Sequence, residues 1–377
     1  MQKSTWLPAI VAPLVVAGAI AAPAIASAAG TGASTTPPSA AKVLAKVASS
    51  RDVAFSGKVT QTSDLGLPDL SSASGGSAST AQSGASTVLE LLTSSHTARV
   101  YVDGPDKARV QVLDSLAERD VIVNGTQVWT WDSKQQRAVH VTLPTRSAAE
   151  DTDTGTATPS DIAEQAIDAI TPTTTVSTPV ATTVAGQPAW KIVLTPKSAT
   201  TLVHDVTLAI DQKTGLPLSA AIGAKGQSAP AVSVAYTSID YGTPSAALFD
   251  FTPPTGATVR TKDLSDRAGK AGAGHATGAS GNGTSATGSA PVTTGTGWGT
   301  IVSLPAGSVD ASSLGAGSGS STGSSTGDDD TALLEQMTTA VDGGRALQSS
   351  LVSVYLADDG RVFAGAVPVA DLVAAAE

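Results

Sequence analysis

Cysteine is absent from the 377-residue sequence, and its absence removes several classes of protein. A disulfide scaffold, a thiolate zinc site, an iron–sulfur cluster and a cysteine nucleophile all require this side chain. A lipid-modified N-terminal cysteine is excluded for the same reason. Aromatic residues are also scarce at 3%, although hydrophobic residues reach 41%. The core is therefore expected to be aliphatic, built mainly from valine, leucine, isoleucine and alanine.

Charged residues are also sparse, and their balance is acidic. They make up 14% of the chain, and the formal net charge is −10. A protein that binds nucleic acid needs a cluster of positive charge on one face. The sequence shows no such cluster, so nucleic acid is not expected as a partner.

The segment 1–28 has the pattern of a secretory signal peptide. Lys3 gives a short positive region, an apolar stretch runs from Trp6 to Ile25, and Ala26-Ser27-Ala28 fits the small-x-small cleavage rule. We expect cleavage after Ala28, which places the mature chain outside the cytoplasm, secreted or in the cell envelope. The alternative is an uncleaved N-terminal segment that tethers the protein to the plasma membrane, because the apolar stretch is long enough to span a bilayer.

Changes in composition divide the remaining chain. Residues 29–38 are a linker, and 39–259 carry enough apolar residues for one large domain. Residues 260–297 are rich in glycine, serine, threonine and alanine and are expected to be a disordered linker. Residues 298–377 form a small C-terminal β/α module that contains a Gly/Ser/Asp-rich loop at 306–330.

Alternation with a period of two dominates the 39–259 domain and predicts strands. Asp103-Gly104-Pro105 and Asn124-Gly125 favour tight turns between neighbouring strands, because glycine and asparagine tolerate positive φ. The stretches 71–86 and 144–159 are expected to be flexible loops. The pattern predicts a mainly β (α+β) fold, in which an antiparallel sheet of about 10–11 strands has helices available to cover one face.

Two short helices are predicted in this domain, and two more in the C-terminal module. The first covers 39–49, where Ser39 can act as the N-cap. The second covers 160–170 and ends before Pro172. In the C-terminal module a helix is expected over 332–341, followed by two strands and a short tail helix.

The segments 99–143 and 248–259 carry a resemblance to a known family. The first reads as a strand, a turn with proline, a strand, a hairpin with Asn124-Gly125 and Trp129-Thr130-Trp131-Asp132, and a further strand. The second, LFDFTPPTGATV, is similar to an F-x-F-x-P-P-x-G-x-x-V ending. Together they resemble the lipoprotein-carrier (LolA-like) superfamily, of an actinobacterial envelope type. Relatives include mycobacterial lipid carriers and the N-terminal domain of RseB/MucB-type sigma-factor regulators.

This resemblance implies a curved, half-open antiparallel barrel with helices covering its concave face. The family holds acyl chains in the apolar cavity between sheet and helices. The mycobacterial carriers are anchored by an acylated cysteine, which this sequence lacks. The resemblance therefore implies a soluble rather than a lipid-anchored carrier.

The apolar face of such a sheet must be covered, and two short helices cover only part of it. An uncovered area packs on a partner or binds an apolar ligand, and each acyl methylene buried contributes about 0.8 kcal/mol. The alternative is that the helices and the C-terminal module fill the concavity. Trp129 and Trp131 are interpreted as core packing under a helix, as cavity lining, or both. The candidate lining residues are Val100, Val102, Val110, Val112, Val121, Val123, Trp129, Trp131, Ile162, Ile167 and Ile170.

Catalytic and metal-binding motifs are weak. Ser39-Ala40-Ala41-Lys42 and Lys213-Thr214-Gly215 match two motifs of penicillin-binding enzymes, but no S-D-N element lies between them. The histidines are isolated from one another, at His96, His140, His204 and His275. We therefore expect no enzyme activity, no metal site and no cofactor.

The sequence leaves two functions open. The first is a non-catalytic carrier of the cell envelope that binds lipid or an acylated lipoprotein. The alternative is an envelope-stress sensor of the anti-sigma-factor type, which binds an envelope or membrane protein through residues 298–377. Arg99, Arg109 and Arg119 recur at equal spacing, either as a basic rim for anionic head groups or as a solvated outer face.

Overall fold

The structure is a computed structural model, and it describes residues 37–66, 95–113, 117–144, 167–264, 291–306 and 338–377. The predicted signal peptide and the predicted loop over 71–86 lie outside these ranges. All but the first residue of the predicted loops over 144–159 and 306–330 lie outside them as well. Within the described ranges, no helix is both long enough and apolar enough to cross a membrane.

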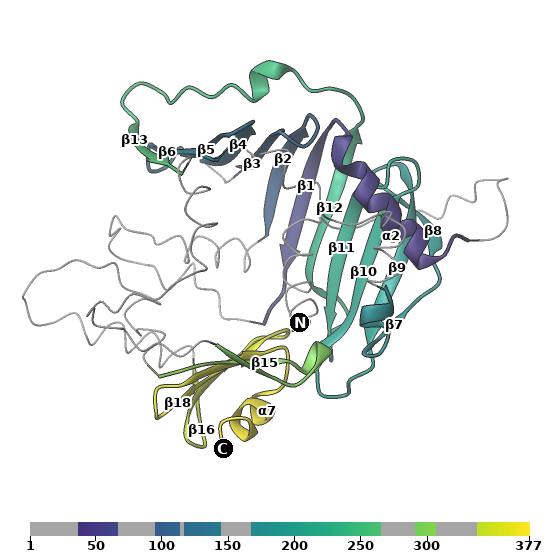
Figure 1. The fold of residues 1–377 in the computed structure, drawn as a ribbon, viewed down its shortest axis with the longest axis vertical. Coiled ribbons are helices and arrows are strands. Elements are labelled where there is room, and N and C mark those ends of the chain that lie inside the picture. The colour runs from purple at the N-terminus through teal and green to yellow at the C-terminus, as the bar shows by residue number, and fades with distance from the viewer. Residues whose placement is uncertain (1–36, 67–94, 114–116, 145–166, 265–290, 307–337) are drawn as a thin grey trace, which may run out of the picture.

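Thirteen strands form one large, curved and open sheet (Figure 1). Its strands are β1 (Phe55–Ser63), β2 (His96–Val102), β3 (Lys107–Leu113), β4 (Glu118–Asn124), β5 (Gln127–Asp132), β6 (Arg137–Thr142), β7 (Thr174–Val176), β8 (Val180–Val184), β9 (Gln187–Pro196), β10 (Val203–Asp211), β11 (Pro217–Ala224), β12 (Pro230–Asp240) and β13 (Thr258–Asp263). Their spatial order is β13-β6-β5-β4-β3-β2-β1-β12-β11-β10-β9-β7, and β8 also pairs with β9.

All of these strand pairs are antiparallel except that of β13 with β6. The predicted mainly β class and the curved, half-open sheet are thus confirmed. The predicted turns are present, because Gly104 and Gly125 take positive φ angles of 70° and 59° between β2 and β3 and between β4 and β5. The strand number exceeds the prediction since short β7 and β8 and the parallel β13 join the sheet.

Helix α2 (Ala40–Ala48) forms where the first helix is predicted, and the short 3-10 turn η1 (Ser49–Asp52) follows it. Ser39 is its N-cap, because the Lys42 backbone N–H donates to Ser39 Oγ over 3.2 Å. Val43 is buried against Ile192 of β9 and Ile210 of β10. The helix therefore covers the β9–β10 end of the sheet. Of the second predicted helix, the structure describes residues 167–170, which are helical.

Residues 241–257, which we call the closing strap, connect β12 to the far edge of the sheet. The strap contains the 3-10 turn η2 (Ala246–Leu248) and then runs into β13. Figure 1 shows it as the green segment that passes over the outer side of β2–β6. The strap therefore covers one face of this half of the sheet, and its last residues continue as a parallel edge strand.

A second sheet of six strands lies against the lower end of the first (Figure 1). Its order is β14-β15-β19-β18-β17-β16, and its elements are β14 (Val292–Thr294), η4 (Gly297–Gly299), β15 (Ile301–Leu304), β16 (Thr339–Val341), β17 (Gly344–Gln348), β18 (Ser353–Ala357), β19 (Val362–Gly365) and α7 (Val369–Ala374). Tyr355, Phe363 and Leu372 are buried in a core of its own.

The two sheets are joined by backbone and side-chain contacts. The Leu202 N–H donates to the Ala366 carbonyl over 2.8 Å, and the Ser350 N–H donates to the Leu65 carbonyl over 2.9 Å. Trp298 Nε1 donates to Thr174 Oγ1 over 2.8 Å. The C-terminal module therefore docks on the large sheet through several separate segments.

Two predictions about the C-terminal half need correction. The helix expected over 332–341 is wrong at its end, because 339–341 form β16, which pairs with β17. The linker expected over 260–297 is ordered at both ends, since β13 extends to Asp263 and β14 begins at Val292. The pairing of β13 with β6 joins residues far apart in sequence, whereas β14 pairs with the nearby β15 and β16 pairs with β17 across the two-residue turn Asp342-Gly343. Residues 265–290 lie outside the described ranges.

Candidate functional site

One face of the β2–β6 half of the sheet is lined by valines. Val100 of β2 lies opposite Val110 of β3, which lies opposite Val121 of β4. Directly paired residues point to the same side of a sheet, and so do residues two apart in one strand. The predicted Val102, Val112 and Val123 therefore share this face. We call it the valine face, and its members are Val100, Val102, Val110, Val112, Val121, Val123, Val128, Val139 and Val141.

The valine face is partly open to solvent. Val100 is only 6% exposed, but the neighbouring Val110 and Val121 are 37% and 46% exposed. Helix α2 packs on β9 and β10, several strands away. Following the strand pairs through β1, β12 and β11 puts α2 and the valine face on the same side of the sheet. The closing strap lies over the opposite side.

Trp129 and Trp131 lie on that opposite side, so the sequence grouped them wrongly with the valines. Trp129 pairs with Ile122 and Trp131 with Asp120, whereas Val121 pairs with Thr130. Phe251 of the strap packs on both rings, with centroid distances of 5.5 Å to Trp129 and 6.1 Å to Trp131. The tryptophans are therefore part of the core beneath the strap.

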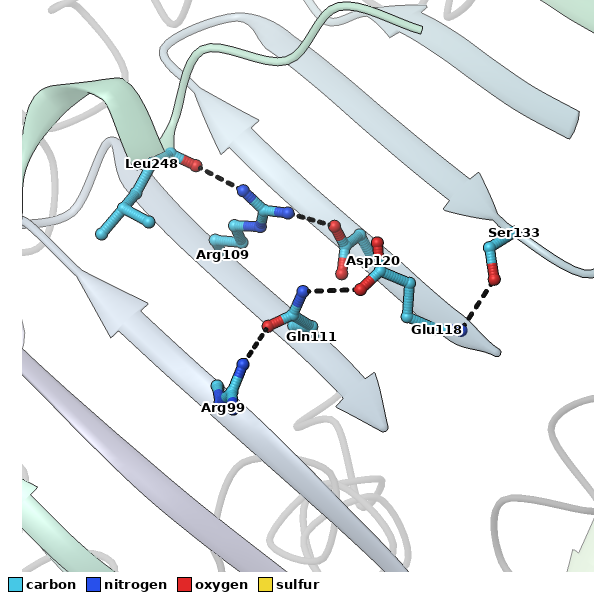
Figure 2. A network of polar contacts seen from close by, with 7 residues as sticks. All are labelled: Arg99, Arg109, Gln111, Glu118, Asp120, Ser133 and Leu248. Atoms are coloured by element: carbon cyan, nitrogen blue, oxygen red, sulfur yellow. Dashed lines mark hydrogen bonds and ion pairs between the residues drawn. The ribbon is translucent and has the colours of Figure 1, made fainter. Parts of the chain in front are cut away.

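Polar contacts fasten the strap to the same face (Figure 2). Arg109 Nη1 donates to the Leu248 carbonyl over 3.3 Å, and Nη2 makes a short ion pair with Asp120. Asn124 Nδ2 donates to Asp250 Oδ1 over 3.3 Å. Arg109 thus bridges the sheet and the strap.

The side chain of Asp120 has no exposed surface, whereas Arg109 is 18% exposed. Burial raises the pKa of Asp120 above its ordinary value, although the hydrogen bond and charge of Arg109 oppose that rise. Gln111 Nε2 donates to Glu118 beside this pair, and Arg99 donates to Gln111 Oε1 (Figure 2). Arg99 and Arg109 therefore do not form a rim around the valine face, and only Arg119 of the three shares it.

The two described isoleucines of the predicted site, Ile167 and Ile170, are located at the other end of the sheet. Ile162 lies outside the described residues. Ile167 lines a cavity of about 530 Å³ beside β7 and the N-terminus of α2, together with Ser39 and Lys197. Ile170 is half-buried in the same helical turn. Four strands, β1, β12, β11 and β10, separate β2 from β9 in this sheet, so the isoleucines and the valine face form two separate apolar regions.

Among the described residues with catalytic or metal-binding chemistry, His140 and the 211–215 turn have local structural roles. His140 stacks on Trp129 with a centroid distance of 4.1 Å, and the exposed His204 lies 3.3 Å from Asp205. Within the described ranges, no group of three or more histidine and acidic side chains is placed to hold a metal ion. Asp211 accepts hydrogen bonds from the 213–214 turn, which explains the K-T-G match as turn chemistry.

Sequence reasoning missed five residues of this region. Val128, Val139 and Val141 share the valine face, and the same period-two rule identifies them. Arg260 and Lys262 border it from β13. They fall in a segment assigned to a linker, and only the long-range pairing of β13 with β6 brings them here.

No family model matches the sequence, and no curated protein matches it. Among solved structures, MucB in complex with MucA(peri) is 15% identical, with 89% of this chain and 96% of that chain covered and a TM-score of 0.42. An uncharacterized conserved protein from Thermus thermophilus is 13% identical, with 59% of this chain and 98% of that chain covered and a TM-score of 0.34. A LolA superfamily protein from Nitrosomonas europaea is 13% identical, with 57% of this chain and 98% of that chain covered and a TM-score of 0.23.

These solved structures include both classes of protein that the sequence resembles, the LolA superfamily and MucB. Their identities are low and their TM-scores lie below 0.5. The likeness therefore carries no weight for the ligand or the partner of this chain, which must be inferred from its own geometry.

Proposed function

We propose that this protein is an extracytoplasmic, non-catalytic binding protein of the cell envelope that carries the acyl chains of a lipid or lipoprotein. The supporting observation is the valine face. Val110 and Val121 are neighbours on adjacent strands, and both keep more than a third of their surface exposed. An exposed cluster of aliphatic side chains on a folded domain is typical of a binding surface.

The size of the face suits an acyl chain. The five strands from β2 to β6 span roughly 19 Å, since neighbouring strands lie about 4.8 Å apart. Burial of ten methylenes would contribute about 8 kcal/mol, before the cost of ordering the chain is subtracted. Valine side chains offer no hydrogen bonds, so the face itself would select for apolar chains without distinguishing their head groups.

The test is the lipid content of the full-length protein, purified from an export-competent host and measured by mass spectrometry of its solvent extract. Val121→Asp puts a charge in the middle of the valine face and should remove bound lipid. Val259→Asp is the matched control, because Val259 is 45% exposed but lies on the opposite face of β13. Lipid retained equally by both folded variants, or absent from the wild type, would refute this function.

A second candidate is a regulatory protein that binds an envelope protein through the C-terminal sheet. The observation in its favour is the open edge at β14, whose residues are all exposed, with Val292 58% exposed. An open edge strand can pair with a strand of another protein. Thr293→Pro should then weaken binding to native envelope membranes but not to lipid-only vesicles. Equal binding of the variant and wild type to native membranes would exclude this route.

A further inference from the structure

Two cations border the valine face at the open edge of the sheet. Arg260 and Lys262 of β13 lie directly opposite Val139 and Val141 of β6. Because paired residues share a side, both cations point to the valine side. Both are exposed. We call this pair the basic edge.

The charge around the basic edge is positive on the valine side, although the whole chain carries −10. The neighbouring carboxylate Asp263 points to the opposite side, since it follows Lys262 by one residue. Asp132, the acidic residue of β5, lies opposite Arg119 and Arg137. On this side of β4, β5, β6 and β13, the charged residues are Arg119, Asp132, Arg137, Arg260 and Lys262.

We propose that the ligand is an anionic amphiphile, with its acyl chain on the valine face and its phosphate at the basic edge. This inference rests on the proposed function and names the class of lipid that it carries. Arg260 is three strands from Val121, a separation of roughly 14 Å. One molecule can therefore contact both regions. Arginine and lysine both form strong charge-assisted hydrogen bonds with phosphate oxygens.

The experiment compares two lipids that both carry a phosphate but differ in head group and net charge, because the choline cation of one neutralises its phosphate. Short-chain phosphatidylglycerol and phosphatidylcholine with identical acyl chains are titrated, as monomers, into the full-length protein by calorimetry. The double variant Arg260→Gln/Lys262→Gln removes the basic edge. The matched control is Lys58→Gln/Arg99→Gln, since these exposed cations lie opposite each other in β1 and β2 on the other side of the sheet.

The wild type should bind phosphatidylglycerol more tightly than phosphatidylcholine, and added salt should reduce the difference. Loss of the basic edge should weaken phosphatidylglycerol binding by roughly fivefold for each cation removed. It should weaken phosphatidylcholine binding much less, because the choline cation offsets the charge of that lipid's phosphate. The control variant should behave as the wild type does.

Other results would overturn the inference. Equal affinity for the two lipids, or equal losses in both double variants, would refute the anionic ligand while leaving acyl-chain binding intact. Binding of inorganic phosphate alone, as tight as that of phosphatidylglycerol, would show a free-phosphate site rather than a lipid site. Failure of the wild type to bind either lipid would refute both this inference and the proposed function.

Discussion

The ion pair between Arg109 and Asp120 offers a quantitative test of how the closing strap is held. Arg109 donates to the strap at Leu248 and to the Asp120 carboxylate, whose side chain is fully buried. Arg109→Ala removes both contacts at once. The variant leaves a buried carboxylate without its partner, and removing one member of such a pair costs about 3–5 kcal/mol.

The loss should depend on pH. Burial already raises the pKa of Asp120, and Arg109 opposes that rise, so the variant raises the pKa further. Between the unfolded and the folded pKa, the folded state keeps a proton that the unfolded state has released. Stability therefore falls as pH rises through this interval, and it falls further in the variant. The penalty should be larger near pH 7 than near pH 2.5, which lies below the ordinary aspartate pKa of 3.8, so that both states hold the proton.

The measurement is chemical denaturation of the wild type and variant at both pH values. Lys107→Ala is the control on the same strand, because the Lys107–Asp103 pair is more exposed and should contribute at most about 1 kcal/mol. Arg109→Met/Asp120→Leu should recover most of the loss, since apolar replacement of a buried pair is often neutral or stabilising. A penalty of similar size at both pH values would refute an unpaired buried carboxylate as its cause.

Three further predictions follow from named contacts. Gly57→Ala should destabilise the protein by about 1–3 kcal/mol in chemical denaturation, because the new Cβ would lie 2.6 Å from the Tyr236 ring. Gly242→Ala is the control and should have little effect, because the space around Gly242 is open. Phe251→Ala should shift tryptophan fluorescence to longer wavelength without changing lipid binding, because it uncovers the strap side alone. Burial raises the pKa of Tyr241 to about 12. The unfolded state therefore loses this proton first, and stability should fall as pH rises above about 10. Tyr241→Phe should remove part of that fall in alkaline denaturation.

Much of the large sheet is predictable because short hairpins connect its strands. The period-two pattern and the turns at Gly104 and Gly125 define β2 to β5, and the valines of β2, β3 and β4 recur at every second position on one face as expected. The closing strap and the parallel β13 could not be derived in this way. Their positions depend on contacts between residues far apart in sequence. The β16–β17 hairpin, by contrast, has a two-residue Asp342-Gly343 turn that the same turn rule identifies.

The misplacement of the tryptophans has a different cause, and the sequence contained the information to avoid it. A two-residue turn at Gly125 and Thr126 sets Asn124 opposite Gln127, so Ile122 must face Trp129. A shift of one residue sends a side chain to the other face of the sheet. Counting the register from the turn is therefore enough to separate the tryptophans from the valines.

This separation decides where function can be sought. On one side of β2–β6, aromatic rings and a buried ion pair fasten the strap, and those side chains are fully engaged in holding the fold. On the other side, Val110 and Val121 keep exposed apolar surface that contributes to stability only when something covers it. Under the proposed function, a ligand would therefore bind on the second side. A charge at Val121 should therefore disrupt binding more than folding, whereas a change at Arg109 should do the reverse.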